Sequence, residues 1–232
     1  MTPTLSEPAP ERGAGFAPRS RAGSSLDQVV QLAAETEAAV SPESVRIMAE
    51  VGAGILINPQ KDWAEVAADL RRYRETFREL KGSEPPAPIV TGWVCCDEDP
   101  VKAKDMAQQY IGGYYESVMA HYELGGRHFE NTQGYEYYSN LASYIEAKGE
   151  ARLVEKFVEL QVYGTPLQCL DRIMDIRGQI GNNGFSAVVS FAGMSHETAV
   201  GNLELFAAEV LPRLKPLPDV APAELAAGGV RG

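Results

Sequence analysis

Two serines and a proline near residue 41 form the clearest candidate for binding chemistry in this sequence. Ser41 directly precedes Pro42, and Ser44 follows two residues after the proline. Serine is a preferred N-cap residue and proline suits the first helical position, so this stretch predicts a helix that starts at Pro42. The free N–H groups and hydroxyls at such a helix start can hold a phosphate or a carboxylate. An ordinary strand-to-helix turn without a ligand explains the pattern equally well.

The histidines offer little further chemistry. His121 and His128 lie seven residues apart, but two glycines separate them and no third ligand is in register, so we expect no metal site. His196 could face a site from the first turn of a helix, although a solvated position is the simpler interpretation. The sequence contains no nucleophile elbow, Walker loop or dinucleotide fingerprint. Any catalysis would therefore depend on a bound cofactor.

Composition excludes several classes of function. The 21 basic and 32 acidic residues give a net charge of −11, which disfavours nucleic acid and anionic membranes as partners. No apolar run of about 18 residues and no secretory signal occurs, so neither a membrane span nor export is predicted. Cys95, Cys96 and Cys169 have neither the spacing of a zinc site nor the even count of a disulfide framework. A reducing cytoplasm is the expected location.

The composition also divides the chain into a folded region and two flanking segments. Residues 1–25 predict a disordered leader and residues 216–232 a disordered tail, because both are rich in small residues and proline. Residues 26–215 are expected to form one domain. Within it, the tyrosine-rich segment 101–161 is helical in pattern and predicts either a lid or a packing annex. Tyrosines at helical spacing favour packing over lining a pocket mouth.

The rest of the domain alternates strands and helices, which indicates a parallel α/β fold. Predicted strands lie at 37–40, 54–58, 89–96 and 185–191. Predicted helices lie at 42–51, 62–80, 166–180 and 196–211, and a further helix is expected to start near residue 100. Asp97 is the predicted N-cap of the helix near residue 100, Thr165 caps the helix at 166–180, and Gly52 ends the helix at 42–51. Four such units are half of a (β/α)8 barrel, which typically needs about 250 residues. The pattern therefore predicts half a barrel or an open sheet, with ligands at the carboxyl ends of the strands.

Two stretches resemble the C-terminal half of the bacterial luciferase-like monooxygenases. The first is 40–54, VSPESVRIMAEVGAG. The second and more specific one begins with GTP at 164–166 and continues with FAGMSHE at 191–197 and LFAAEVLPRL at 205–214. The resemblance implies a (β/α)8 fold of the TIM-barrel type, of which this chain holds strands five to eight, with a helical insertion before the last strand. Strands one to four have no counterpart here.

The resemblance also implies a cofactor. Members of the family use reduced FMN with oxygen, or the deazaflavin F420, on aldehydes and other small organic substrates. Hydroxyl residues after the fifth strand contact the flavin phosphate in the family, and Ser41 and Ser44 match them. Much of the substrate wall and of the ring contacts comes from the half without a counterpart, so no catalytic residue can be assigned. Glu43 would repel a phosphate if it turned inward.

Two hypotheses follow from the sequence. The first is a truncated flavin-dependent monooxygenase or oxidoreductase that acts on a small organic substrate. The second is a non-catalytic half-barrel fragment that associates with itself or complements a partner. A half barrel leaves two strand edges unpaired and is expected to leave Ile55, Ile57 and Val189 uncovered, so a homo-oligomer is predicted.

Overall fold

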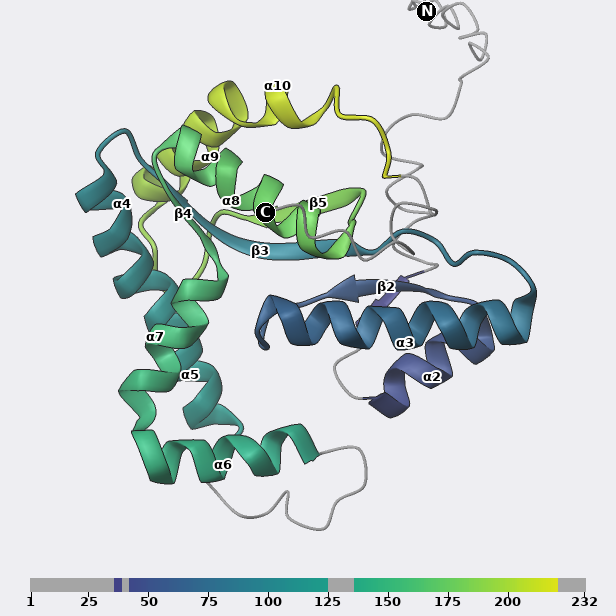
Figure 1. Cartoon of the computed structure of the whole chain (residues 1–232). Helices are drawn as coiled ribbons and strands as arrows, with labels where there is room; N and C mark the ends of the chain where they lie inside the picture. The colour runs from purple at the N-terminus through teal and green to yellow at the C-terminus, as the bar shows by residue number, and fades with distance from the viewer. Residues whose placement is uncertain (1–35, 39–41, 125–135, 221–232) are drawn as a thin grey trace, which may run out of the picture. The chain divides into compact units, whose positions relative to one another are not determined.

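The computed structural model describes residues 36–38, 42–124 and 136–220, and its sheet is organised around one long strand, β3 (Ile89–Cys96) (Figure 1). Side-chain burial is described for 46–124 and 140–220. β3 is rich in β-branched and aromatic residues, which favour strands. The predicted leader lies outside the described residues, and the predicted tail is described only as far as Val220.

All strand pairs in the sheet are parallel. β1 (Thr36–Ala38) pairs with β2 (Gly54–Ile57), and the end of β2 pairs with the start of β3. β5 (Gly184–Val188) pairs with the first five residues of β3, and β4 (Val162–Gly164) pairs with its last three. Among the described residues, β1 pairs only with β2 and β5 only with β3, so the sheet is not closed. The predicted α/β class and the partial barrel are confirmed.

β4 was not among the predicted strands. Its three residues, Val162–Gly164, are too short to show the alternation by which a strand is recognised. The helical insertion therefore precedes β4 in the chain, and β4 with its helix forms a βα unit of its own before β5. β5 also ends at Val188, three residues earlier than predicted.

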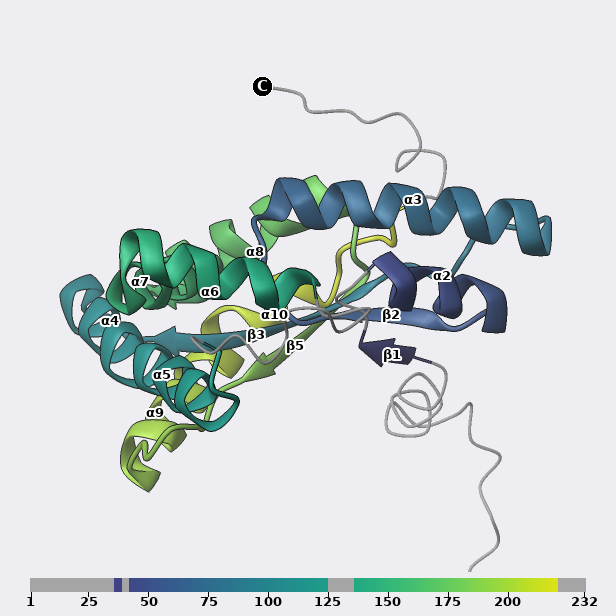
Figure 2. The same cartoon turned by 90° about the horizontal axis from the view of Figure 1, so that it is seen from below.

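Two groups of helices accompany the sheet. The first comprises α2 (Pro42–Val51), α3 (Trp63–Lys81), α8 (Pro166–Ile180), α9 (His196–Glu209) and α10 (Leu211–Leu214). The second is the insertion, which comprises α4 (Pro100–Met106), the π-helical η1 (Ala107–Gly112), α5 (Gly113–His121), α6 (Glu136–Lys148) and α7 (Glu150–Leu160). α3 and α8 pack against each other on one side of the sheet (Figure 2). None of the helices in the described ranges is long and apolar enough to cross a membrane.

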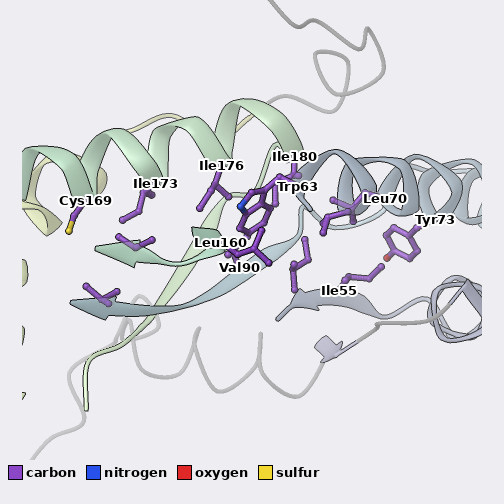
Figure 3. Close-up of a cluster of buried hydrophobic side chains, with 14 of the residues drawn as sticks. Ile55, Trp63, Leu70, Tyr73, Val90, Leu160, Cys169, Ile173, Ile176 and Ile180 are labelled. Atoms are coloured by element: carbon purple, nitrogen blue, oxygen red, sulfur yellow. The ribbon is translucent and has the colours of Figure 1, made fainter. Parts of the chain in front are cut away.

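The two faces of β3 belong to two separate cores. Val90 and Val94 lie in the sheet–helix core, which is the buried cluster between the strands and α2, α3, α8 and α9. Figure 3 shows part of this core, where Val90 lies beneath Ile176 and Ile180 of α8 and Ile55 lies beneath Leu70 and Tyr73 of α3. Trp93 and Cys95 lie instead in the insertion core, the buried cluster formed with α4, η1, α5, α6 and α7. The alternation follows from the two-residue period of a strand.

This arrangement corrects one expectation. Ile55 and Ile57 were expected to be uncovered, but they are 3% and 5% exposed and lie in the sheet–helix core. Val189 is partly buried against the same core. On the opposite face, the insertion helices cover Trp93 and Cys95. Because these strand residues are covered within the chain, they give no reason to expect self-association.

Three of the predicted helix caps and stops lie in the described residues, and two of these three agree with the structure. Thr165 caps α8, as predicted, and the structure adds a reciprocal capping box with Gln168. Gly52 follows α2 with φ of +84° and donates its N–H to Met48, so it ends the helix as predicted. The cap of α4 was predicted at Asp97 but lies at Asp99, whose carboxylate accepts from Val101 and Lys102.

Candidate functional site

The predicted phosphate site lies at the start of α2, after the carboxyl end of β1. α2 begins at Pro42, as the sequence predicts. Ser44 is the third residue of the helix, although its side chain is not described, and Ser41 lies outside the described residues. The first N–H groups of a helix have no partner within it, so the backbone of α2 presents donors here. Farther along α2, Arg46 is held by Glu50 at 2.8 Å.

Two buried amide side chains, those of Gln161 and Asn202, connect β3 to neighbouring segments of the chain. Gln161, which is 1% exposed, accepts from the N–H of Trp93 at 3.3 Å and donates to the carbonyl of Pro59 at 3.2 Å. It thereby joins β3 to the loop after β2. Gln161 itself directly precedes β4, which begins at Val162. Sequence reasoning missed this residue, although a lone amide between Leu160 and Val162 signals a buried polar role.

Asn202, a residue of α9, forms hydrogen bonds with the end of β3. Its Oδ1 accepts from the N–H of Cys96 at 2.8 Å, and its Nδ2 donates to Val94 at 2.7 Å and Val189 at 3.0 Å. The residue is 2% exposed. Sequence reasoning also missed it, although it lies on the same face of α9 as the buried Ala199 and Phe206. These bonds hold the carboxyl end of β3 in a fixed position relative to α9.

Two adjoining pockets lie where the loop after β2 meets the insertion. The larger encloses about 480 Å³ between the start of α3 and helices α6, α7 and α8. The smaller encloses about 180 Å³ between the loop after β2 and helices α5, α6 and α7. Tyr144, Lys156 and Leu160 line both pockets and separate them. Ligands of parallel α/β folds bind beyond the carboxyl ends of strands, which is where this loop lies.

The charges around the pockets are paired in different ways. Lys61 contacts Asp69 at 2.9 Å, and their side chains are only 10% and 15% exposed. Lys156 contacts Asp62 at 2.9 Å, but this pair is 34% and 58% exposed. The hydrogen bond to Asp62 holds the pKa of Lys156 above its usual value. The Lys156 ammonium also lies 5.9 Å from the centre of the Tyr144 ring.

The aromatic residues of the insertion pack mainly with one another. Tyr115 stacks on Phe157 with ring centres 4.1 Å apart, and Trp93 lies 4.8 Å from Tyr114 and 5.5 Å from Phe157. Burial raises the pKa of Tyr114. For these residues the packing interpretation of the tyrosine-rich segment is confirmed, while Tyr115 also reaches the wall of the smaller pocket.

The cysteines and histidines lie where they offer little chemistry. Cys95, Cys96 and Cys169 are buried free thiols, and burial raises the pKa of Cys95 to about 12. His196 is the first residue of α9 and is exposed, and His128 lies outside the described residues. Within residues 36–38, 42–124 and 136–220, no three metal-ligating side chains come together.

Comparison with known proteins identifies the fold. Residues 22–183 match the sequence pattern of the luciferase-like monooxygenase family. The monooxygenase RslO1 from Streptomyces bottropensis is 21% identical, with a TM-score of 0.50, and the match covers 76% of this chain and 46% of that one. No curated protein matches the chain.

Two further solved structures support the same fold. The FMN complex of the oxygenating constituent of 3,6-diketocamphane monooxygenase from Pseudomonas putida is 18% identical, with a TM-score of 0.51 and coverage of 79% of this chain and 48% of that one. EDTA monooxygenase from Chelativorans sp. BNC1 is 13% identical, with a TM-score of 0.53 and coverage of 82% and 48%. The chain thus spans about half the length of these structures.

Proposed function

Because the chain belongs to the luciferase-like monooxygenase family, we propose that it is part of a flavin-dependent oxidoreductase that acts on a small organic substrate. The observation that carries the proposal is the β1–α2 unit, in which a parallel strand leads into a helix that begins at Pro42. The open parallel sheet and the length of the match support a partial barrel. The three free cysteines fit a reducing cytoplasm.

The proposed cofactor is FMN or F420, with its phosphate at the start of α2. Backbone N–H groups at a helix N-terminus and two serine hydroxyls are donors of the kind that a phosphate accepts from, so the residue types fit the group. Ser41 and Ser44 would bind the phosphate and orient the cofactor. A bound flavin would supply the hydride or oxygen transfer. The side chains of this chain would bind the cofactor and exclude water from it.

Flavin titration of the purified chain tests this proposal. We expect FMN or F420 fluorescence to change with a Kd below about 100 µM, which corresponds to about −5.5 kcal/mol. The double variant Ser41→Ala, Ser44→Ala should weaken binding by about tenfold or more. Ser117→Ala, on the exposed face of α5, is the matched control and should bind like the unchanged chain. Absence of binding at that concentration would refute the enzyme hypothesis for this chain.

A second candidate function is that of a non-catalytic half barrel that pairs with another polypeptide. It is favoured by β5, which has no second neighbour in the described residues and whose side chains are half-buried or exposed. Parallel strands with free edges can add a further strand. Mass measurement in solution distinguishes the candidates. A homo-oligomer that binds no flavin would favour this function, and a flavin-binding monomer would exclude it.

A further inference from the structure

The two adjoining pockets are lined by cations that are held in ion pairs. The larger pocket is lined by Arg152, Lys156 and Arg172 against two carboxylates, those of Asp62 and Glu159. The smaller pocket is lined by two lysines against one carboxylate. The chain as a whole has a net charge of −11. These cations have carboxylate partners, some of them just outside the lining: Arg152 contacts Glu155 at 2.8 Å, and Arg172 contacts Asp175 at 3.3 Å. An anionic ligand at this place must therefore take over one of the exposed ion pairs, which are weak.

The smaller pocket has a mixed lining, one part of which is apolar and suits the body of such a ligand. Leu141, Leu153 and Phe157, which line it, are 7%, 5% and 3% exposed. Its volume of about 180 Å³ is close to the roughly 150 Å³ of an apolar cavity that binds benzene. A single six-membered ring therefore fits between these side chains, with the aromatic ring of Tyr144 on the wall.

Lys156 lies at the junction of the two pockets and is the cation best placed to meet a ligand. Its ion pair with Asp62 is open to solvent, and exposed ion pairs are weak and exchangeable. Lys61 is less available, because its pair with Asp69 is shielded from solvent. A carboxylate that enters the smaller pocket with its ring inward would reach Lys156 and displace Asp62.

We propose that these pockets form a binding site for a small organic carboxylate, whose apolar or aromatic body fills the smaller pocket and whose carboxylate pairs with Lys156. Arg152 and Arg172 also line the larger pocket, but ion pairs with Glu155 and Asp175 hold them, and the proposal does not use them. The site is inferred from the pockets alone. Only the further step, that its occupant is the substrate, rests on the proposed flavin-dependent function.

Calorimetric titration of the full chain without flavin tests the site with three probes. Benzoate carries the ring and the charge, benzyl alcohol carries only the ring, and inorganic phosphate carries only the charge. We expect benzoate to bind at least about tenfold more tightly than either of the others. Failure of benzoate to bind at about 10 mM, or equal binding of benzyl alcohol or phosphate, would overturn the proposal.

Two substitutions with opposite expected effects sharpen the test. Lys156→Met keeps the length of the side chain and should weaken benzoate binding about tenfold, whereas Asp62→Asn removes the competing carboxylate and should tighten it. Arg46→Met, whose ion pair with Glu50 lies on α2 outside both pockets, is the matched control. If Lys156→Met has no effect, or if Asp62→Asn weakens binding, the assignment is wrong.

A parallel flavin titration separates this inference from the proposed function. Benzoate binding without flavin binding would leave the carboxylate site in place and remove the enzyme hypothesis. Flavin binding without benzoate binding would overturn the carboxylate site and leave the enzyme hypothesis in place.

Discussion

The side chain of Asn202 accepts a hydrogen bond of 2.8 Å from the backbone N–H of Cys96, so α9 is joined directly to the last residue of β3. The same amide donates to Val94 and Val189 and is almost fully buried. Its loss would take this partner from two buried backbone groups, those of Cys96 and Val94, and from the partly buried carbonyl of Val189, which is more costly than the loss of an exposed bond.

We therefore expect Asn202→Ala to lower the free energy of unfolding by about 2–4 kcal/mol, as measured by urea denaturation. Asn140→Ala removes the same side chain from an exposed position on α6 and should change stability by less than about 0.5 kcal/mol. Similar effects of the two variants would show that the bonds to Cys96, Val94 and Val189 do not stabilise the fold.

Trp63 presents the opposite case, a buried donor without an acceptor. Its side chain is 5% exposed, and no described group accepts from its Nε1. Trp63→Phe removes that donor and keeps most of the ring, so we expect a change in unfolding free energy of less than about 1 kcal/mol. Trp63→Ala should lose about 3–5 kcal/mol, because it empties a site in the sheet–helix core. A large loss in the phenylalanine variant would reveal an acceptor for the indole.

The buried thiol of Cys95 predicts a pH dependence of stability. Burial raises the pKa of Cys95 to about 12, whereas an unfolded thiol titrates near about 8.5. The folded state therefore holds the proton more tightly. The stability from this group is present below the unfolded pKa and is lost as pH rises from about 8.5 toward 12.

Urea denaturation at a series of pH values between about 8 and 10 measures this slope. Tyr73 adds to the slope above about pH 10, since burial raises its pKa to about 12 as well. Cys95→Ala should reduce the slope below about pH 10, and the raised pKa of Cys169, which shares a hydrogen bond with Cys96, leaves part of the slope in place. An unchanged slope in this variant would exclude Cys95 as the source.

Gly92 lies where β3 and β5 approach each other closely. A Cβ at this position would lie 2.6 Å from Cζ of Phe185, so a larger residue must displace that ring. We expect Gly92→Ala to destabilise the protein by about 1–3 kcal/mol. Gly113→Ala is the matched control, because a Cβ there meets no atom within 4 Å and the residue lies in α5. The control should be neutral or stabilising by up to about 1 kcal/mol in the same thermal melt.

Features that depend on neighbouring residues were predictable from the sequence. The start of α2 at Pro42 and the cap of α8 at Thr165 follow from local residue types, and the structure has both. The parallel order of strands followed from the alternation of elements, because long connections suit parallel pairing. The phosphate contacts of Ser41 and Ser44 remain a prediction.

Features that depend on distant contacts could not be predicted. Gln161 and Asn202 contact residues that are far away in the chain, and a single amide gives no sign of which carbonyl it will meet. Ile55 and Ile57 were assigned to the wrong face, because residues in a strand that is buried on both sides look alike from sequence. The pockets depend on how α6 and α7 pack beside the loop after β2, which the residue pattern does not specify.

Because β3 contributes side chains to both cores, the insertion and the sheet are linked when the protein unfolds. Val94 belongs to the sheet–helix core and its neighbour Trp93 to the insertion core, so the insertion cannot swing away without exposing a tryptophan of the central strand. The insertion and the sheet should therefore unfold as one cooperative unit. Amide hydrogen exchange would show this as equal protection of β3 and α7, both close to the free energy of global unfolding.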